Sequence, residues 1–233
     1  MSQLLLTIDT SGKNGSLALA LATEGNSEIK LLEAVPLAGG TFSAQLVPQI
    51  AALLAKHGRT KADLSGFAVV SGPGSFTGLR VGLGAIKALA EILQKPIASI
   101  SLLEAVACST SRHGHILAAL DAGRAEVYVG DYETTDCSRM RSERLLTRDE
   151  FLTEVGADKA GGAGKPVVTP DAGLAEIVRS AGTPCDHIPY PAAEVIARIG
   201  WQHIQRGKTV RPEDLEANYI RRSDAEIFSQ PRR

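Results

Sequence analysis

The segment from residue 66 to residue 93 limits the fold of this chain more than any other. Its sequence, GFAVVSGPGSFTGLRVGLGAIKALAEIL, begins as a buried strand, passes through a glycine-rich turn with one proline, and continues as a long apolar helix. Ser75 or Thr77 can cap the start of that helix. A strand that runs directly into a helix is typical of a sheet with helices on its faces, so we expect an α/β protein.

The elements around this unit predict a mixed sheet. Residues 3–9, 16–22 and 29–35 are apolar runs joined by short turns, which indicates three consecutive antiparallel strands. A helix from about residue 43 to Gly58 follows them, and another strand and helix come after the long helix. The resulting order, β-β-β-α-β-α-β-α, is the layout of a ribonuclease-H-like lobe of the actin-like ATPase superfamily.

The second half of the chain is less regular. Two strands joined by the turn AGRA are followed by three helical segments, at residues 148–155, 171–182 and 190–206. We therefore expect two ribonuclease-H-like lobes. The first spans residues 1–110 and carries the interface helices, and the second spans residues 111–233. The second is smaller and degenerate, and its last segment is expected to pack back on the first lobe.

Composition restricts the classes of function that this chain can have. The formal net charge is −1, so no overall basic field attracts nucleic acid, and RNA binding would need a partner's surface. The three cysteines, Cys108, Cys137 and Cys185, form no CxxC pair, which excludes a zinc ribbon and fits reduced thiols in a cytoplasm. No apolar run approaches the roughly 20 residues that span a bilayer, and the N-terminus lacks a basic signal-peptide start. We expect a cytoplasmic protein with no membrane contact.

Two turns are candidates for holding a phosphate, and the glycine-rich turn is the first. Gly72 and Gly74 permit positive φ and close approach of a ligand, and Ser75 stands where free N–H groups open the helix. The turn lacks the Gly-Lys-Ser/Thr of a P-loop and the spacing of a dinucleotide fingerprint. Glycines that only let the helix pack closely on the sheet explain the turn equally well.

The turn after the first strand is the second candidate. Asp9, Thr10 and Ser11 could position a magnesium ion and meet a phosphate, as in nucleotide-binding proteins of this fold. These residue types are also ordinary turn formers, and the residues alone favour that interpretation. No histidine pair, nucleophile elbow or cysteine–histidine pair completes a constellation. We therefore expect no catalytic residue, no metal site and no intrinsic cofactor.

Several segments together resemble the TsaB family, also called YeaZ or glycoprotease-like proteins. They are IDTS and GSLALA near the start, SGPGSFTGLRVGL in the middle, LAALDAGRAEVYVGDY after it and NYIRRSDAE near the end. The resemblance covers most of the chain, from residue 4 to about residue 226. It implies a non-catalytic subunit required for threonylcarbamoyladenosine in tRNA, paired with the catalytic TsaD and joined by the ATPase TsaE.

The resemblance also implies an interface. Helices of the first lobe would pair with TsaD, homodimers could form, tRNA would be met only through the complex, and ATP or ADP could sit at the partner interface. Phe42 stands where the family usually has a histidine, which favours a contact over chemistry. The two helices carry more apolar residues than one buried face needs, although both stripes could face the chain's own core. The expected interface residues are Phe42, Leu46, Ile50, Leu53, Leu54, Leu83, Ile86 and Leu89.

Two other functions stay open. A small-molecule kinase or ATPase of the same fold would use Asp9 and the glycine-rich turn, with AGGAG at residues 160–164 as a second phosphate loop. An inactive metallopeptidase homologue is the other alternative. The resemblance implies that TsaD binds metal through an HxxxH pattern, and this chain lacks that pattern, which argues against peptidase activity. Calorimetry with ATP and magnesium, together with metal analysis, distinguishes both from a partner subunit.

Overall fold

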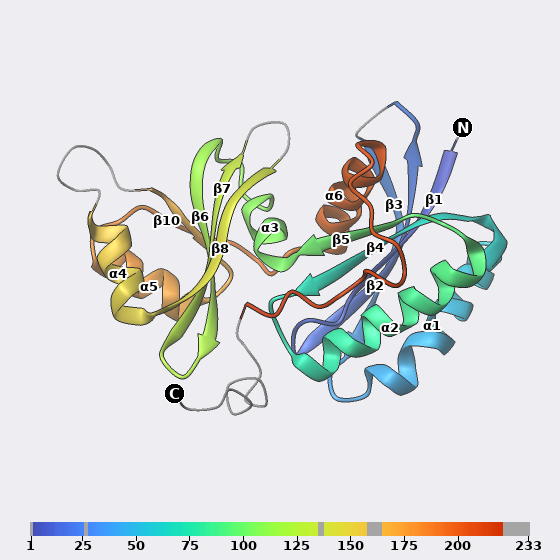
Figure 1. The fold of residues 1–233 in the computed structure, drawn as a ribbon, viewed down its shortest axis with the longest axis horizontal. Coiled ribbons are helices and arrows are strands. Elements are labelled where there is room, and N and C mark those ends of the chain that lie inside the picture. The colour runs from blue at the N-terminus through green and yellow to red at the C-terminus, as the bar shows by residue number, and fades with distance from the viewer. Residues whose placement is uncertain (1, 26–27, 135–137, 158–164, 221–233) are drawn as a thin grey trace, which may run out of the picture.

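Two lobes lie side by side in the computed structural model, which describes residues 2–25, 28–134, 138–157 and 165–220. Each lobe is built on one five-stranded sheet (Figure 1). The AGGAG segment, named above as a possible second phosphate loop, lies outside the described residues. Within those residues, no helix is both long and apolar enough to cross a membrane.

The first sheet has the strand order β3-β2-β1-β4-β5. Its first three strands pair antiparallel, because short turns join them, and β4 and β5 add in parallel through helical crossovers. This is the ribonuclease-H-like topology expected from the sequence. The strands are β1 (Ser2–Asp9), β2 (Asn14–Thr23), β3 (Ile29–Ala38), β4 (Leu64–Gly72) and β5 (Ile97–Ser101).

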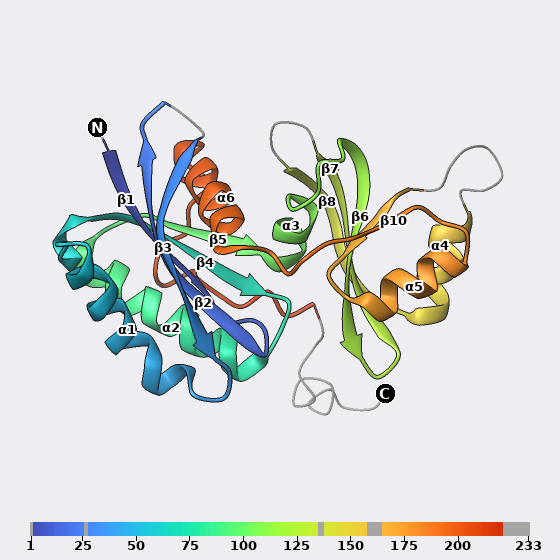
Figure 2. The same cartoon turned by 180° about the vertical axis from the view of Figure 1, so that it is seen from behind.

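Helices cover both faces of the first sheet (Figure 2). Side chains alternate between the two faces of a strand, and in β1 Leu6 packs toward α1 (Phe42–Lys56) and α2 (Phe76–Leu93). Leu5 points to the other face, where it shares a buried cluster with α6 (Ala193–Gln205). Because α6 comes near the end of the chain, the C-terminal part returns to the first lobe.

The second sheet repeats the topology of the first. Read from the β8 edge, its order is β8-β7-β6-β9-β10, with antiparallel pairing among β6, β7 and β8 and parallel pairing among β6, β9 and β10. The fold class expected from the sequence, two ribonuclease-H-like lobes of the actin-like ATPase superfamily, is therefore confirmed. The strands are β6 (Gly114–Gly123), β7 (Glu126–Thr134), β8 (Ser138–Thr147), β9 (Val167–Thr169) and β10 (Cys185–His187).

The helices of the second lobe also lie on both faces of its sheet. One face packs against α4 (Arg148–Ala157) and α5 (Ala172–Ser180). On the other face, α3 (Leu102–Ala107) lies between the lobes and shares one buried cluster with α6 (Figure 1). A short 3-10 turn, Lys61–Asp63, precedes β4. The two lobes thus share apolar packing where α3 meets α6.

Three strands of the second lobe do not follow from the sequence pattern. The sequence of β8, SRMRSERLLT, is mostly polar because this strand lies at the edge of the sheet. β9 and β10 have three residues each, which is too short to show alternation. Without these strands, the sequence pattern does not give the strand order of the second sheet.

Candidate functional site

A cavity of about 490 Å³ opens between the lobes beside the glycine-rich turn. The first lobe contributes Lys13, Gly40 and Ser75 to its lining, and the second contributes Asp121 and Tyr128. Lys13 and Asp121 are the charged residues of the lining, so its charges cancel. An anionic ligand in this cavity would meet one cation and one carboxylate.

The Asp9 carboxylate is closed off by its own turn. Its Oδ1 accepts hydrogen bonds from the Ser11 N–H at 2.8 Å and from the Ser11 hydroxyl at 2.6 Å. Its Oδ2 accepts one from the Tyr190 hydroxyl at 3.2 Å. Asp9 is 1% exposed, and each of its two carboxylate oxygens already accepts a hydrogen bond from within the chain. The arrangement supports the interpretation of this turn as structural.

Tyr190 is the residue that the sequence analysis missed at this site. It reaches Asp9 from a loop before α6, far away in the sequence. Burial raises the pKa of the Tyr190 phenol, and the neighbouring Asp9 carboxylate adds to that rise. The phenol therefore keeps its proton and remains a donor to Asp9. No local sequence signal pairs these two residues.

Asp9→Asn is expected to leave the chain at least as stable as the wild type at pH 7. Burial raises the pKa of Asp9, so the folded chain binds this proton more tightly than the unfolded chain. Protonated Asp9 therefore stabilises the folded chain. This contribution is fully present below the pKa of Asp9 in the unfolded chain, about 3.9, and is lost as the pH rises through the higher pKa of Asp9 in the folded chain. Asparagine keeps the accepting oxygen for Ser11 without the buried charge. Urea unfolding from about pH 4 to pH 7 measures the difference.

Ser11→Ala is the matched control, because it keeps the buried charge and removes one donor. It should lower the free energy of unfolding by about 1–3 kcal/mol at pH 7. An Asp9→Asn variant that unfolds more easily than the wild type at pH 7 would show that the carboxylate stabilises the fold, contrary to this interpretation.

Thr10 joins the same turn to α2. Its hydroxyl donates to the Gly78 carbonyl oxygen at 2.8 Å. A Cβ at Gly78 would lie 2.1 Å from the Thr10 carbonyl oxygen, and one at Gly82 would lie 2.4 Å from Thr10 Oγ1. Both glycines therefore allow α2 to contact the turn closely, as the packing interpretation of the glycine-rich segment expects.

The glycine-rich turn itself lies against the turn after β1. The Ser75 N–H donates to the Ser11 carbonyl oxygen at 2.7 Å, and a Cβ at Gly74 would lie 2.3 Å from that oxygen. Ser75 caps α2, because its hydroxyl oxygen accepts from the Gly78 N–H. Gly72 is buried and has a positive φ of 125°. Of the six residues expected to face a nucleotide, only Ser11, Gly74 and Ser75 line the cavity.

The second lobe places one carboxylate, that of Asp121, in the lining of the cavity. Asp121 lies near the end of the central strand β6, as Asp9 does in β1. Its N–H donates to Asp171 Oδ2 at 2.8 Å, and its own Oδ1 accepts from the Gly123 N–H at 2.9 Å. Burial raises the pKa of Asp171, and the hydrogen bond from the Asp121 N–H opposes that rise. The Asp121 carboxylate makes this side of the cavity unfavourable for a phosphate.

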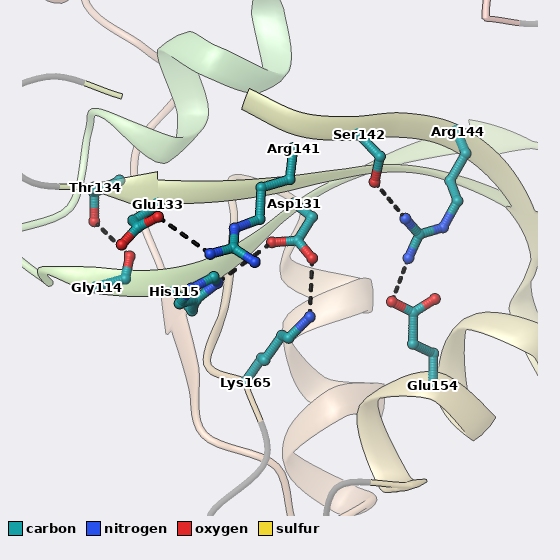
Figure 3. Close-up of polar contacts among 10 residues, drawn as sticks. All are labelled: Gly114, His115, Asp131, Glu133, Thr134, Arg141, Ser142, Arg144, Glu154 and Lys165. Atoms are coloured by element: carbon teal, nitrogen blue, oxygen red, sulfur yellow. Dashed lines mark hydrogen bonds and ion pairs between the residues drawn. The ribbon is translucent and has the colours of Figure 1, made fainter. Parts of the chain in front are cut away.

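A polar cluster extends across β6, β7 and β8 and reaches α4 (Figure 3). Asp131 Oδ2 pairs with Lys165 Nζ at 2.8 Å, and its Oδ1 lies 3.8 Å from His115 Nδ1. Two further pairs complete the cluster, Arg141–Glu133 at 3.2 Å and Arg144–Glu154. Each cation drawn in Figure 3 faces a carboxylate, so the cluster provides no excess positive charge for RNA. Across the described part of the chain, no three His, Cys, Asp or Glu side chains are placed to hold a metal ion.

The structure places most of the expected interface residues inside the first lobe. Seven of the eight are buried in the core of the first lobe, where they pack on the sheet, and Leu89 is half-buried. Their side chains are therefore not available to a partner in the folded chain. The seven are Phe42, Leu46, Ile50, Leu53, Leu54, Leu83 and Ile86.

The exposed side of the same two helices contains several small or aliphatic residues. Val47 on α1 is 65% exposed and Ile92 on α2 is 70% exposed. Between Phe42 and Ala55, α1 contains no charged residue, although half of it faces solvent. We use the name α1/α2 face for eight of the exposed, uncharged residues of these helices: Ala44, Val47, Pro48, Ala51 and Ala55 on α1, with Gly84, Ala88 and Ile92 on α2.

The two ribonuclease-H-like lobes define a protein of the actin-like ATPase fold, and the Asp9–Ser11 turn lies in the first lobe. Residues 36–147 match the family model of TsaD, described as tRNA N6-adenosine threonylcarbamoyltransferase. The chain is 28% identical to tRNA threonylcarbamoyladenosine biosynthesis protein TsaB of Escherichia coli, over 95% of this chain and 96% of that one. It is 37% identical to TsaB of Bacillus subtilis over 55% of each chain.

A solved structure gives the same assignment. YeaZ from Pseudomonas aeruginosa superposes with a TM-score of 0.72 at 26% identity, covering 93% of this chain and 99% of that chain. The chain belongs to the TsaB family, whose members are also named YeaZ.

Proposed function

We propose that this chain is a cytoplasmic, non-catalytic subunit of the machinery that makes threonylcarbamoyladenosine in tRNA, and that it pairs with TsaD through the α1/α2 face. The observation that carries the proposal is the exposed side of α1, which has no charge from Phe42 to Ala55. The names of its TsaB relatives supply the pathway.

The chemistry of the α1/α2 face fits a helical partner. Exposed faces of helices in globular proteins are usually rich in charged residues, and a contiguous uncharged face indicates a contact surface. Side chains as small as alanine and glycine let the backbones of two helices approach closely. Such a face loses little side-chain entropy when it is covered.

The match to TsaD indicates what the partner offers in return. The matched segment, residues 36–147, contains both α1 and α2. A TsaD chain therefore carries two helices in corresponding positions, and the two pairs can form a four-helix contact. A second copy of this chain would use the same face, so homodimer formation and TsaD pairing should compete. TsaE would then contact the pair outside this face.

The sealed turn supports a non-catalytic role. The Asp9 oxygens already accept hydrogen bonds from Ser11 and Tyr190, and the cavity beside them has no net charge. A kinase of this fold would need that carboxylate for its magnesium ion. These features favour a subunit that provides shape and surface to the complex.

Reconstitution with purified proteins tests the proposal. We expect the chain to bind TsaD of the same organism with one-to-one stoichiometry in calorimetry. We also expect it to form no modified adenosine alone and to be required when TsaD, TsaE and unmodified tRNA are combined. Full activity of the mixture without this chain would contradict the proposal. Tight ATP–magnesium binding by the lone chain would support the kinase alternative.

A further inference from the structure

The last described segment, residues 210–220, crosses the first lobe and ends beside α2 (red in Figure 1). We call it the C-terminal strap. At its start, the Val210 N–H donates to the Ile97 carbonyl oxygen of β5 at 2.9 Å. Leu215 in its middle is 1% exposed and belongs to the core beneath α1 and α2. The strap is therefore anchored along the lobe.

Asn218 fastens the strap to both lobes. Its N–H donates to the Ser71 carbonyl oxygen of β4 at 2.7 Å, and its side-chain Nδ2 donates to Glu143 Oε2 of β8 at 2.6 Å. The other oxygen of Glu143 accepts from the Ser101 and Tyr132 hydroxyls. One carboxylate of the second lobe thus holds the strap and the end of β5 together.

Tyr219, the residue after Asn218, lies against Phe76, the first residue of α2. The two ring centroids are 5.3 Å apart with an interplanar angle of 33°, and the Arg80 guanidinium carbon lies 3.7 Å from the Phe76 centroid. Phe76 is 42% exposed and Tyr219 is 41% exposed. Three flat groups therefore form a stack that remains open to solvent.

The stack continues the α1/α2 face. Positions 76, 80, 84, 88 and 92 follow each other at four-residue spacing on α2, and all five residues there are exposed. Phe76 and Arg80 of the stack are the first two residues of this row, at the N-terminal end of α2. Aromatic rings and arginine are also the side chains that most often dominate the energy of protein interfaces.

We propose that the Tyr219–Phe76–Arg80 stack is a second contact point for TsaD and receives a flat side chain, either a guanidinium group or an aromatic ring. The inference rests on the proposed function, because continuity with the α1/α2 face identifies the occupant. Asn218 and Glu143 act as positioning residues that hold Tyr219 against Phe76. The C-terminal strap thereby becomes part of the docking surface.

A protein fits this surface better than RNA does. RNA binding depends on several phosphate contacts from clustered cations. Along the exposed side of α2, Arg80 is followed by small residues and then by Glu91, and the exposed side of α1 has no charge before Lys56. Among the described residues of α1 and α2, stacking on Tyr219 would therefore find few cations that could contact neighbouring phosphates.

Calorimetric titration of TsaD with variants of the full chain tests the stack. Tyr219→Ala should weaken binding about tenfold, which is within the range for loss of an aromatic contact. Tyr219→Phe keeps the ring and should bind like the wild type. Met140→Ala is the control, because it removes a side chain that is 56% exposed on the second lobe.

A double-mutant cycle tests the positioning role of Asn218. Asn218→Ala should weaken TsaD binding in the wild-type chain but add almost nothing in the Tyr219→Ala background. A general loss of stability would instead act in both backgrounds.

Unchanged TsaD affinity of Tyr219→Ala would overturn the stack proposal. If Tyr219→Ala weakened only the binding of tRNA to the assembled complex, the stack would be an RNA contact. That result would also overturn the proposal that the stack contacts TsaD. Failure of the wild-type chain to bind TsaD would refute the proposed function itself, and the stack proposal with it.

Discussion

Ala88→Glu should abolish binding to TsaD while the isolated chain stays folded. Ala88 is exposed in the middle of the α1/α2 face, so a longer side chain has room there, and glutamate is a good helix former. In the complex its carboxylate would be buried among small apolar side chains without a cation. An uncompensated buried charge costs about 4 kcal/mol, which corresponds to roughly a thousandfold loss of affinity. Calorimetry gives the affinity and circular dichroism gives the fold.

Ala172→Glu provides the matched control. Ala172 is an exposed alanine at the start of α5 in the second lobe, away from the α1/α2 face. This variant should bind TsaD like the wild type. Co-elution of Ala88→Glu with TsaD, or an equal loss of binding in both variants, would contradict the proposed interface.

The apolar content of α1 and α2 predicted interface residues, and the structure buries seven of the eight in the first lobe. Two apolar stripes run along each helix, and the sequence does not say which of them faces the sheet. The structure shows that the bulky residues, such as Leu53 and Ile86, fill the core, and that the small ones remain outside. Close packing explains this division, because branched side chains fill the space above a sheet better than alanine does.

The first lobe was predictable because its signals are local. Tight turns after Asp9 and Thr23 and the glycine-rich turn after Ser71 mark where its strands end, so the strand order follows. The second lobe has the same topology, but β8 is polar and β9 and β10 are very short. Their pairing is fixed by contacts between distant segments, which a single sequence does not reveal.

The candidate site also depends on contacts between distant segments, which the sequence does not reveal. The sequence correctly located both turns, but it could not say whether Asp9 was open to a ligand. The answer depends on Tyr190, which comes from a loop distant in the sequence and donates a hydrogen bond to Asp9 Oδ2. The proposed stack likewise needs Tyr219 to meet Phe76, and only the folded chain brings these rings together.

Gly78→Ala and Gly84→Ala should change stability in opposite directions, although both lie on α2. A Cβ at Gly78 would lie 2.1 Å from the Thr10 carbonyl oxygen, which is backbone and cannot rotate away. α2 would have to lift from the turn after β1, and we expect a loss of about 3 kcal/mol in the free energy of unfolding. A Cβ at Gly84 meets nothing within 4 Å, so alanine should stabilise the helix by about 1 kcal/mol. Urea unfolding of the two variants measures both values.

The same pair of variants separates packing from ligand binding in the glycine-rich segment. If its glycines served to admit a phosphate, Gly78→Ala would weaken ligand binding and leave stability nearly unchanged, because the new methyl group would occupy ligand space. If they serve to seat α2 on the Thr10 turn, stability falls without any ligand present. Gly84 lies on the α1/α2 face, so Gly84→Ala should also weaken TsaD binding while it strengthens the fold. That combination arises only when a glycine is kept for the approach of another chain, because the folded chain alone is more stable with alanine.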